Sequence, residues 1–87
     1  MPEISRFFGI IILMFADDHL PPHYHAKYAE FEATINIESG EILKGFLPKS
    51  QLRLVQAWNE IHKNEILINY NLLNSNKQTF SKIKPLE

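Results

Sequence analysis

Cysteine is absent from this chain of 87 residues, so disulfide bonds and thiolate metal sites are excluded. An excess of positive charge is absent too: nine lysine and arginine residues stand against ten aspartate and glutamate residues, for a net charge of −1. A nucleic-acid binder usually needs a positive field to neutralise phosphates. The composition therefore argues against DNA as a partner, and the lack of cysteine fits a reducing compartment such as the cytoplasm.

A hydrophobic run long enough to cross a membrane is also absent. The longest apolar run, residues 7–16 (FFGIIILMFA), is about half the roughly 20 residues that a spanning helix needs. Arg6 alone precedes it and two aspartates follow it, which is not the pattern of a signal peptide. The side chains at odd and at even positions of this run are all apolar or small, as is typical of a central strand covered on both faces. We predict one buried strand over residues 4–16.

Residues 23–28 and 31–37 alternate apolar and polar side chains, which predicts a hairpin with a turn at Ala29 and Glu30. This register gives three apolar and three polar cross-strand pairs: Tyr28–Phe31, Ala26–Ala33 and Tyr24–Ile35, then Lys27–Glu32, His25–Thr34 and His23–Asn36. A shift by one residue would scramble both sets. Because neither turn residue readily adopts the positive φ of tight hairpins, a slightly longer loop is the alternative.

The second half of the chain predicts one short strand and one helix. Ser39 and Gly40 are typical of a turn, which leads into a fourth strand over residues 41–45. Pro48 is typical of a helix start, and apolar residues at spacings of three, four and seven predict a helix over residues 49–74.

Two further features complete the predicted fold. Asn64 marks a point where the helix could kink, and residues 75–87 are expected to form a polar, solvated tail. The prediction is a single α+β domain over residues 1–87, with a four-stranded, mainly antiparallel β-meander packed in two layers on one long or kinked C-terminal helix.

Three of the four histidines fall within residues 17–28, DDHLPPHYHAKY. His23 and His25 are two apart on a predicted strand, so both side chains leave the same face. Together with His19 they could hold a zinc ion, and Asp17 and Asp18 could add oxygen ligands. The structural alternative gives His23 a hydrogen bond to Asn36 or the loop and His25 one to Thr34.

The same histidines also suit acid–base chemistry. A pair of imidazoles can act as general base and general acid in phosphodiester cleavage, with His19 nearby. Arg6 or Lys27 could then stabilise the charge that develops on phosphate. No nucleophile motif or glycine-rich phosphate loop is present. The fourth histidine, His62, follows Trp58 by four residues in the predicted helix and is interpreted as a residue at the edge of the core.

The stretches MPEISRFFGIIILMF, DDHLPPHYHAKY, EATINIESGEILKGFLPK and AWNEIHKNEILINYNLL resemble the bacterial domain-of-unknown-function 4160 family. The most specific part is the string H-x-P-P-H-x-H-A, met by His19, Pro21, Pro22, His23, His25 and Ala26. The resemblance implies a small prokaryotic protein, often encoded beside a short protein of the family numbered 2442 and regarded as a toxin–antitoxin component. The sequence departs from the pattern at Ala29 and Glu30, where glycine is more typical, and at Tyr70, where tryptophan is common.

Three functions are carried forward from these observations. The leading hypothesis is a small cytoplasmic partner-binding protein of a toxin–antitoxin-type module, without a cofactor, forming a homodimer or a heterodimer with a neighbouring small protein. Leftover apolar residues on the uncovered sheet face favour it. The alternative is a histidine-dependent ribonuclease or metal-assisted hydrolase acting through His19, His23 and His25, with zinc as the metal. A DNA-binding regulator is third, supported only by Lys77, Lys82 and Lys84.

Overall fold

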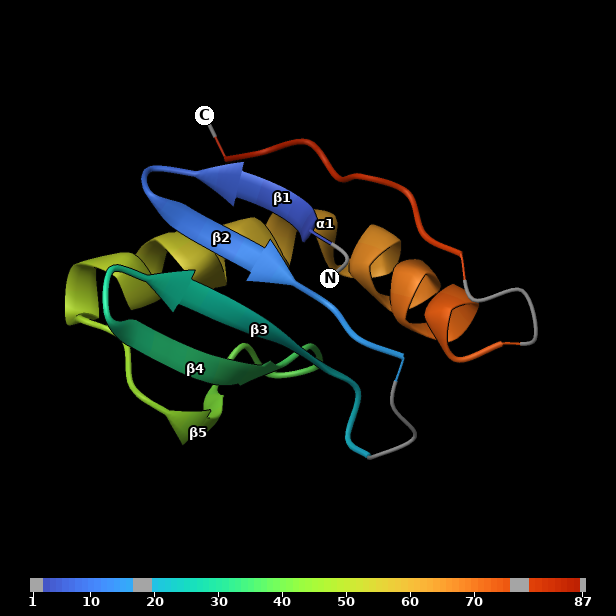
Figure 1. The fold of residues 1–87 in the computed structure, drawn as a ribbon, viewed down its shortest axis with the longest axis horizontal. Coiled ribbons are helices and arrows are strands. Elements are labelled where there is room, and N and C mark those ends of the chain that lie inside the picture. The colour runs from blue at the N-terminus through green and yellow to red at the C-terminus, as the bar shows by residue number, and fades with distance from the viewer. Residues whose placement is uncertain (1–2, 17–19, 76–78, 87) are drawn as a thin grey trace.

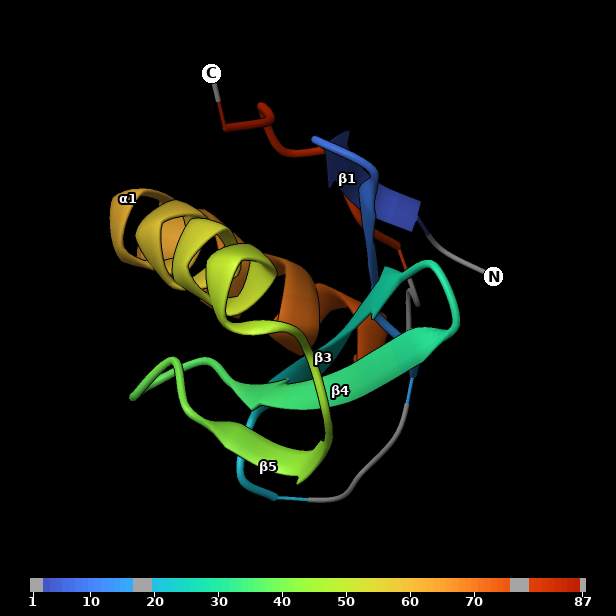
Figure 2. The same cartoon turned by 90° about the vertical axis from the view of Figure 1, so that its left-hand side faces the viewer.

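The structure is a computed structural model that describes residues 3–16, 20–75 and 79–86. Across these described residues, five antiparallel strands form one sheet in the order of the chain, and one long helix follows. The elements are β1 (Glu3–Phe7), β2 (Ile10–Leu13), β3 (His23–Tyr28), β4 (Phe31–Asn36), β5 (Ile42–Gly45) and α1 (Lys49–Leu73). The helix lies across one face of the sheet (Figures 1 and 2), so the α+β class and the two-layer arrangement are as predicted.

The prediction of a single first strand over residues 4–16 is wrong. This stretch turns back on itself, and Phe7 pairs with Ile10 across a two-residue turn. Phe8 and Gly9 have φ values of 49° and 78°, which are the positive angles that a tight hairpin needs at both central positions. The sheet therefore has five strands. Odd and even positions of the run are both apolar because the run supplies two neighbouring strands, with Phe8 exposed at the turn between them.

The β3–β4 hairpin follows the predicted register at all six cross-strand pairs, from Tyr28–Phe31 to His23–Asn36. Ala29 adopts a φ of 52°, so the two-residue turn forms although alanine rarely takes this conformation. The alternation of apolar and polar side chains thus outweighed the unfavourable turn chemistry, because a register slip would have moved every apolar side chain out of the core.

The core lies between the sheet and α1. Its fully buried side chains include Trp58, Tyr24, Ile12 and Ile35. A chain of hydrogen bonds connects the two layers: the Tyr24 hydroxyl donates to Asn59 Oδ1 at 2.8 Å, and Asn59 Nδ2 donates to the Ile37 carbonyl at 3.0 Å. Both polar side chains are thereby satisfied inside the core.

Helix α1 is continuous over Lys49–Leu73 apart from one residue, His62, whose φ of −111° and ψ of 18° mark a kink. The kink was predicted at Asn64, two residues later. Among the described residues, no helix is both long enough and apolar enough to pass through a membrane.

The expectation of a solvated tail after residue 75 is wrong for residues 79–86. This segment runs back along β1 and α1 (Figures 1 and 2), and Ile83 is only 4% exposed. The Ile83 amide donates to the Ile4 carbonyl at 2.9 Å. Apolar side chains spaced through the polar sequence explain the docking, since Phe80 and Leu86 pack on the core beside Ile83.

Candidate functional site

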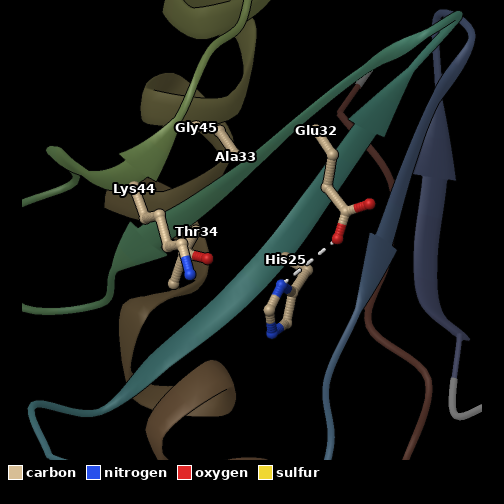
Figure 3. A pocket seen from close by; sticks show the side chains of 6 residues that line it. All are labelled: His25, Glu32, Ala33, Thr34, Lys44 and Gly45. Atoms are coloured by element: carbon tan, nitrogen blue, oxygen red, sulfur yellow. Dashed lines mark ion pairs between the residues drawn. The ribbon is translucent and has the colours of Figure 1, made fainter.

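The sheet face that α1 does not cover carries the histidines of interest. Tyr24 and Ala26 are fully buried on the helix side, so the intervening side chains of β3 point the opposite way. Across the sheet, Leu13, His25, Thr34 and Lys44 form one lateral row through the pairs of β2, β3, β4 and β5. Figure 3 shows α1 behind the sheet and the side chains of His25, Glu32, Thr34 and Lys44 in front of it.

His25 stands at the centre of this face. Its Nδ1 lies 3.5 Å from Oε2 of Glu32, which makes an ion pair when the imidazole is protonated. The His25 side chain is 22% exposed, whereas that of Glu32 is 52% exposed. The Phe15 ring packs edge-on against the imidazole, with ring centroids 5.0 Å apart. His25 is therefore held by an aromatic neighbour and a carboxylate, yet it still reaches solvent.

A pocket of about 240 Å³ opens beside this pair (Figure 3). It is lined by His25, Glu32, Ala33, Thr34, Lys44 and Gly45. The pocket thus combines an imidazole, a carboxylate, a hydroxyl and an ammonium group. These are the groups that proton transfer and the binding of an anionic substrate require.

Gly45 closes one side of the pocket for a steric reason. Its φ is +89°, and a Cβ at this position would overlap the carbonyl oxygen of Glu32 and approach the Cα of Ala33 to 3.0 Å. Only glycine fits there without a shift of the main chain. The close approach of β4 and β5 also sets where the side chain of Lys44, the preceding residue, projects from β5.

His23 lies two residues before His25 on β3, on the same face but at the end of the strand that Tyr70 of α1 reaches. Its ring centroid is 5.7 Å from that of His25 and 6.1 Å from that of Tyr70 on α1. Its Nδ1 is 2.9 Å from the carbonyl oxygen of Pro21, which follows a cis peptide bond. A carbonyl can only accept a hydrogen bond, so Nδ1 carries the proton. In the neutral ring the basic nitrogen is then Nε2.

Arg6 does not join the histidines, although the sequence suggested it as a phosphate ligand. It lies on β1, which is separated from β3 by β2, and its Nη2 donates to Glu3 Oε1 at 2.8 Å. This hydrogen bond lowers the pKa of Glu3 and raises the pKa of Arg6. Lys27, the other suggested cation, pairs in register with Glu32 one row away from His25.

His19, Asp17 and Asp18 lie outside the described residues, so the suggested zinc site stays a prediction. Within the ranges that the structure describes, no three histidine or acidic residues gather closely enough to hold a metal ion. His62 is far along α1 and takes no part in this site. Its Nδ1 is 2.8 Å from Glu65 Oε1, and its ring packs against Trp58 at 5.9 Å, as expected at the edge of the core.

Sequence reasoning placed Thr34 opposite His25, as the structure has it, but missed Glu32 and Lys44 as neighbours of His25. Glu32 was placed opposite Lys27, and its diagonal reach to His25 is a regular feature of antiparallel pairs that could have been considered. Nothing in the sequence indicated that Lys44 would lie near His25. The β4–β5 register shifts between Thr34 and Ile35, and the position of an irregularity of this kind is not readable from alternation.

Comparison with protein families gives a match. A family model described as "Domain of unknown function (DUF4160)" matches residues 9–71, well over half of the chain, and this range contains β2 to β5 and most of α1. No curated protein and no solved structure matches the chain. The matched range includes all of the pocket residues and both described histidines of the sheet face. The chain therefore belongs to the DUF4160 family of domains of unknown function.

Proposed function

We propose that the protein is a cytoplasmic, histidine-dependent ribonuclease whose site is formed by His23, His25, Glu32 and Lys44. The observation that carries the proposal is the pocket on the open sheet face, where His25 pairs with Glu32 and Lys44 lines the same wall. RNA suits this site because it brings its own nucleophile, the 2′-hydroxyl group. Two imidazoles and one cation are then sufficient, which agrees with the absence of a nucleophile motif in the sequence.

His23 is suited to the role of general base. The hydrogen bond from its Nδ1 to the Pro21 carbonyl leaves Nε2 as the basic atom and fixes the ring orientation. In the proposed reaction Nε2 removes the proton from the 2′-hydroxyl, and the 2′-oxygen attacks the adjacent phosphorus. A general base has to lie within hydrogen-bond reach of that proton.

His25 is suited to the complementary role of general acid. The Glu32 carboxylate lies 3.5 Å from Nδ1 of His25 and pairs with the ring when it is protonated, and the protonated ring is the form that can donate a proton. As the bond between phosphorus and the 5′-oxygen breaks, His25 protonates the leaving oxygen. The products are a 2′,3′-cyclic phosphate and a 5′-hydroxyl group. Lys44, on the same pocket, stabilises the negative charge that develops on the phosphoryl oxygens.

Cleavage of a fluorescent RNA oligonucleotide by purified protein tests the proposal. We expect His23→Asn and His25→Asn each to reduce the rate by roughly 10²- to 10⁴-fold, since general acid–base groups contribute about that much. His62→Asn is the matched control, because His62 pairs with Glu65 away from the pocket and its replacement should leave cleavage unchanged. A folded wild-type protein that leaves RNA intact, or equal rates in all three variants, would refute the ribonuclease.

Partner binding in a two-protein module is a second candidate, favoured by apolar side chains at the surface. Ile61 and Ile68 on α1 are 65% and 58% exposed. Large apolar side chains that stay exposed in this way often mark an interface. The family resemblance adds the neighbouring small protein of family 2442 as the candidate partner. A toxin–antitoxin-type module would then combine both proposals, with the partner restraining the ribonuclease.

Size-exclusion chromatography with light scattering tests this second candidate. Co-expression with the neighbouring gene product should give a complex whose mass is the sum of both chains, or a homodimer when the protein is expressed alone. An Ile61→Asp, Ile68→Asp variant should weaken the complex, whereas Phe8→Asp, at the tip of the first hairpin, is the matched control. A strict monomer that ignores its neighbour would rule this candidate out.

A further inference from the structure

Residues 79–86, here called the C-terminal segment, occupy a groove between β1 and α1. Figures 1 and 2 both show this segment beside β1 on the way back along the helix. Three points fix it. Asn69 Oδ1 accepts from the Ser81 amide at 2.9 Å while Asn69 Nδ2 donates to the Ser81 carbonyl at 2.6 Å. The Ile83 amide donates to the Ile4 carbonyl at 2.9 Å, and Trp58 Nε1 donates to the Lys84 carbonyl at 3.0 Å.

All four of these hydrogen bonds involve main-chain atoms of the segment. Any extended chain offers the same amides and carbonyls, so this part of the recognition does not depend on sequence. On the body of the protein, the partners are built into the core. Asn69 is 2% exposed and Trp58 is fully buried, so an empty groove would leave their polar groups without these hydrogen bonds. The groove is thus formed to hold an extended peptide.

The side chains of the segment add a simple specificity. Ile83 fills the one deep position, at 4% exposure, while Phe80 and Leu86 pack on the core from partly exposed positions. Lys82 shares a pocket of about 130 Å³ with Glu65, and its charge also acts on Glu3. An aliphatic residue beside basic residues therefore complements the groove and its acidic rim.

Apolar surface of α1 remains uncovered at two places beside the bound segment. Ile68 lines the pocket that contains Lys82 and Ile83, and Ile61 lines a second pocket, of about 260 Å³, with Lys84, Pro85 and Leu86. Both isoleucines stay more than half exposed although the C-terminal segment lies next to them. A larger apolar segment in the same groove would cover them as well. The strand pairs of the sheet do not involve the C-terminal segment.

We propose that the groove between β1 and α1 binds an extended segment of a partner protein, with an aliphatic residue flanked by lysine or arginine, and that this segment displaces the C-terminal segment. The C-terminal segment then acts as an internal competitor. Because it belongs to the same chain, it binds at a high effective concentration, and only a partner segment with additional contacts replaces it. Ile61 and Ile68 supply those contacts. The inference is independent of the ribonuclease site on the other face of the sheet.

Fluorescence anisotropy with a labelled peptide of residues 79–87, TFSKIKPLE, tests the proposal on the full-length protein. The wild type should bind the peptide weakly, because its own segment competes. Ile83→Asp, which weakens the internal segment, should bind at least about ten times more tightly, as loss of an intramolecular competitor predicts. A peptide with aspartate in place of that isoleucine should not bind. Leu43→Asp, at the opposite edge of the sheet, is the matched control and should behave as the wild type.

A second variant covers the case in which Ile83→Asp does not fold. Ser81→Pro removes the amide that donates to Asn69 and leaves Ile83 in place. No binding by a folded variant, or equal binding of the aspartate peptide, would overturn the proposal, as would unfolding of both variants. Dimerisation of the wild type that is lost in Ile83→Asp would identify a second copy as the occupant and overturn the assignment to another protein. RNA cleavage should be unchanged in both variants, so the outcome is separable from the ribonuclease test.

Discussion

Removal of the Tyr24 hydroxyl should destabilise the protein strongly for so small a change. Tyr24 is fully buried, and its hydroxyl donates to Asn59 Oδ1 at 2.8 Å. In Tyr24→Phe the carboxamide oxygen of Asn59 loses this donor while Asn59, at 2% exposure, stays in place through its bond to Ile37. A buried polar group left without its partner costs about 1–3 kcal/mol. A loss of about 2 kcal/mol lowers Tm by roughly 8–16 °C in a domain of this size.

Urea unfolding followed by circular dichroism measures this loss. Tyr28→Phe is the matched control, because it removes the same hydroxyl from a half-buried tyrosine on the same strand. We expect the control to change the free energy of unfolding by less than about 0.5 kcal/mol, as is usual for surface changes. An equal loss in both variants would refute the argument that the chain from Tyr24 through Asn59 to Ile37 joins the sheet to the helix.

Three further predictions concern pH, the pocket and metal. Burial raises the pKa of Tyr24, so this tyrosine ionises in the unfolded state at a lower pH than in the folded state. The free energy of unfolding should therefore stay constant up to about pH 10 and decrease above it. Urea midpoints measured against pH should show this decrease, and the decrease should be smaller in Tyr24→Phe. Gly45→Ala should lower the free energy of unfolding by at least about 1–2 kcal/mol, because alanine at positive φ is strained and its Cβ would overlap the carbonyl oxygen of Glu32. The same variant should slow RNA cleavage. A stability equal to that of the wild type would contradict the steric argument. Treatment with EDTA should leave cleavage unchanged, whereas loss of activity together with stoichiometric zinc that disappears in His25→Asn would favour the metal-assisted hydrolase.

The sequence predicted the parts of the fold that depend on alternation. The β3–β4 register and the position of α1 follow from patterns that only one arrangement can bury. The first hairpin was missed because an apolar turn residue, Phe8, hides the break between two apolar strands. Gly9 was the one residue in this stretch that could have indicated a turn. The docking of residues 79–86 was missed for two reasons. Its apolar side chains are isolated among polar residues, and composition does not reveal the main-chain hydrogen bonds of Ser81, Ile83 and Lys84.

The candidate site was predictable to a similar extent. The shared face of His23 and His25 follows from a spacing of two on a strand, and the ring separation of 5.7 Å agrees with it. Arg6, one of the two cations suggested from the sequence, lies two strands away from the histidines in the sheet. Lys44 lies on the strand beside Thr34 only because β5 pairs with β4 through an irregular register.

The products formed from an oligonucleotide with a single ribonucleotide in a DNA background test the central claim most directly. Attack by the 2′-oxygen requires that ribonucleotide, so cleavage should occur only there and should leave a 2′,3′-cyclic phosphate and a 5′-hydroxyl, both identifiable by mass spectrometry. The all-DNA oligonucleotide should stay intact. Cleavage at a deoxyribonucleotide, or products that carry a 5′-phosphate, would contradict an acid–base site built from His23 and His25.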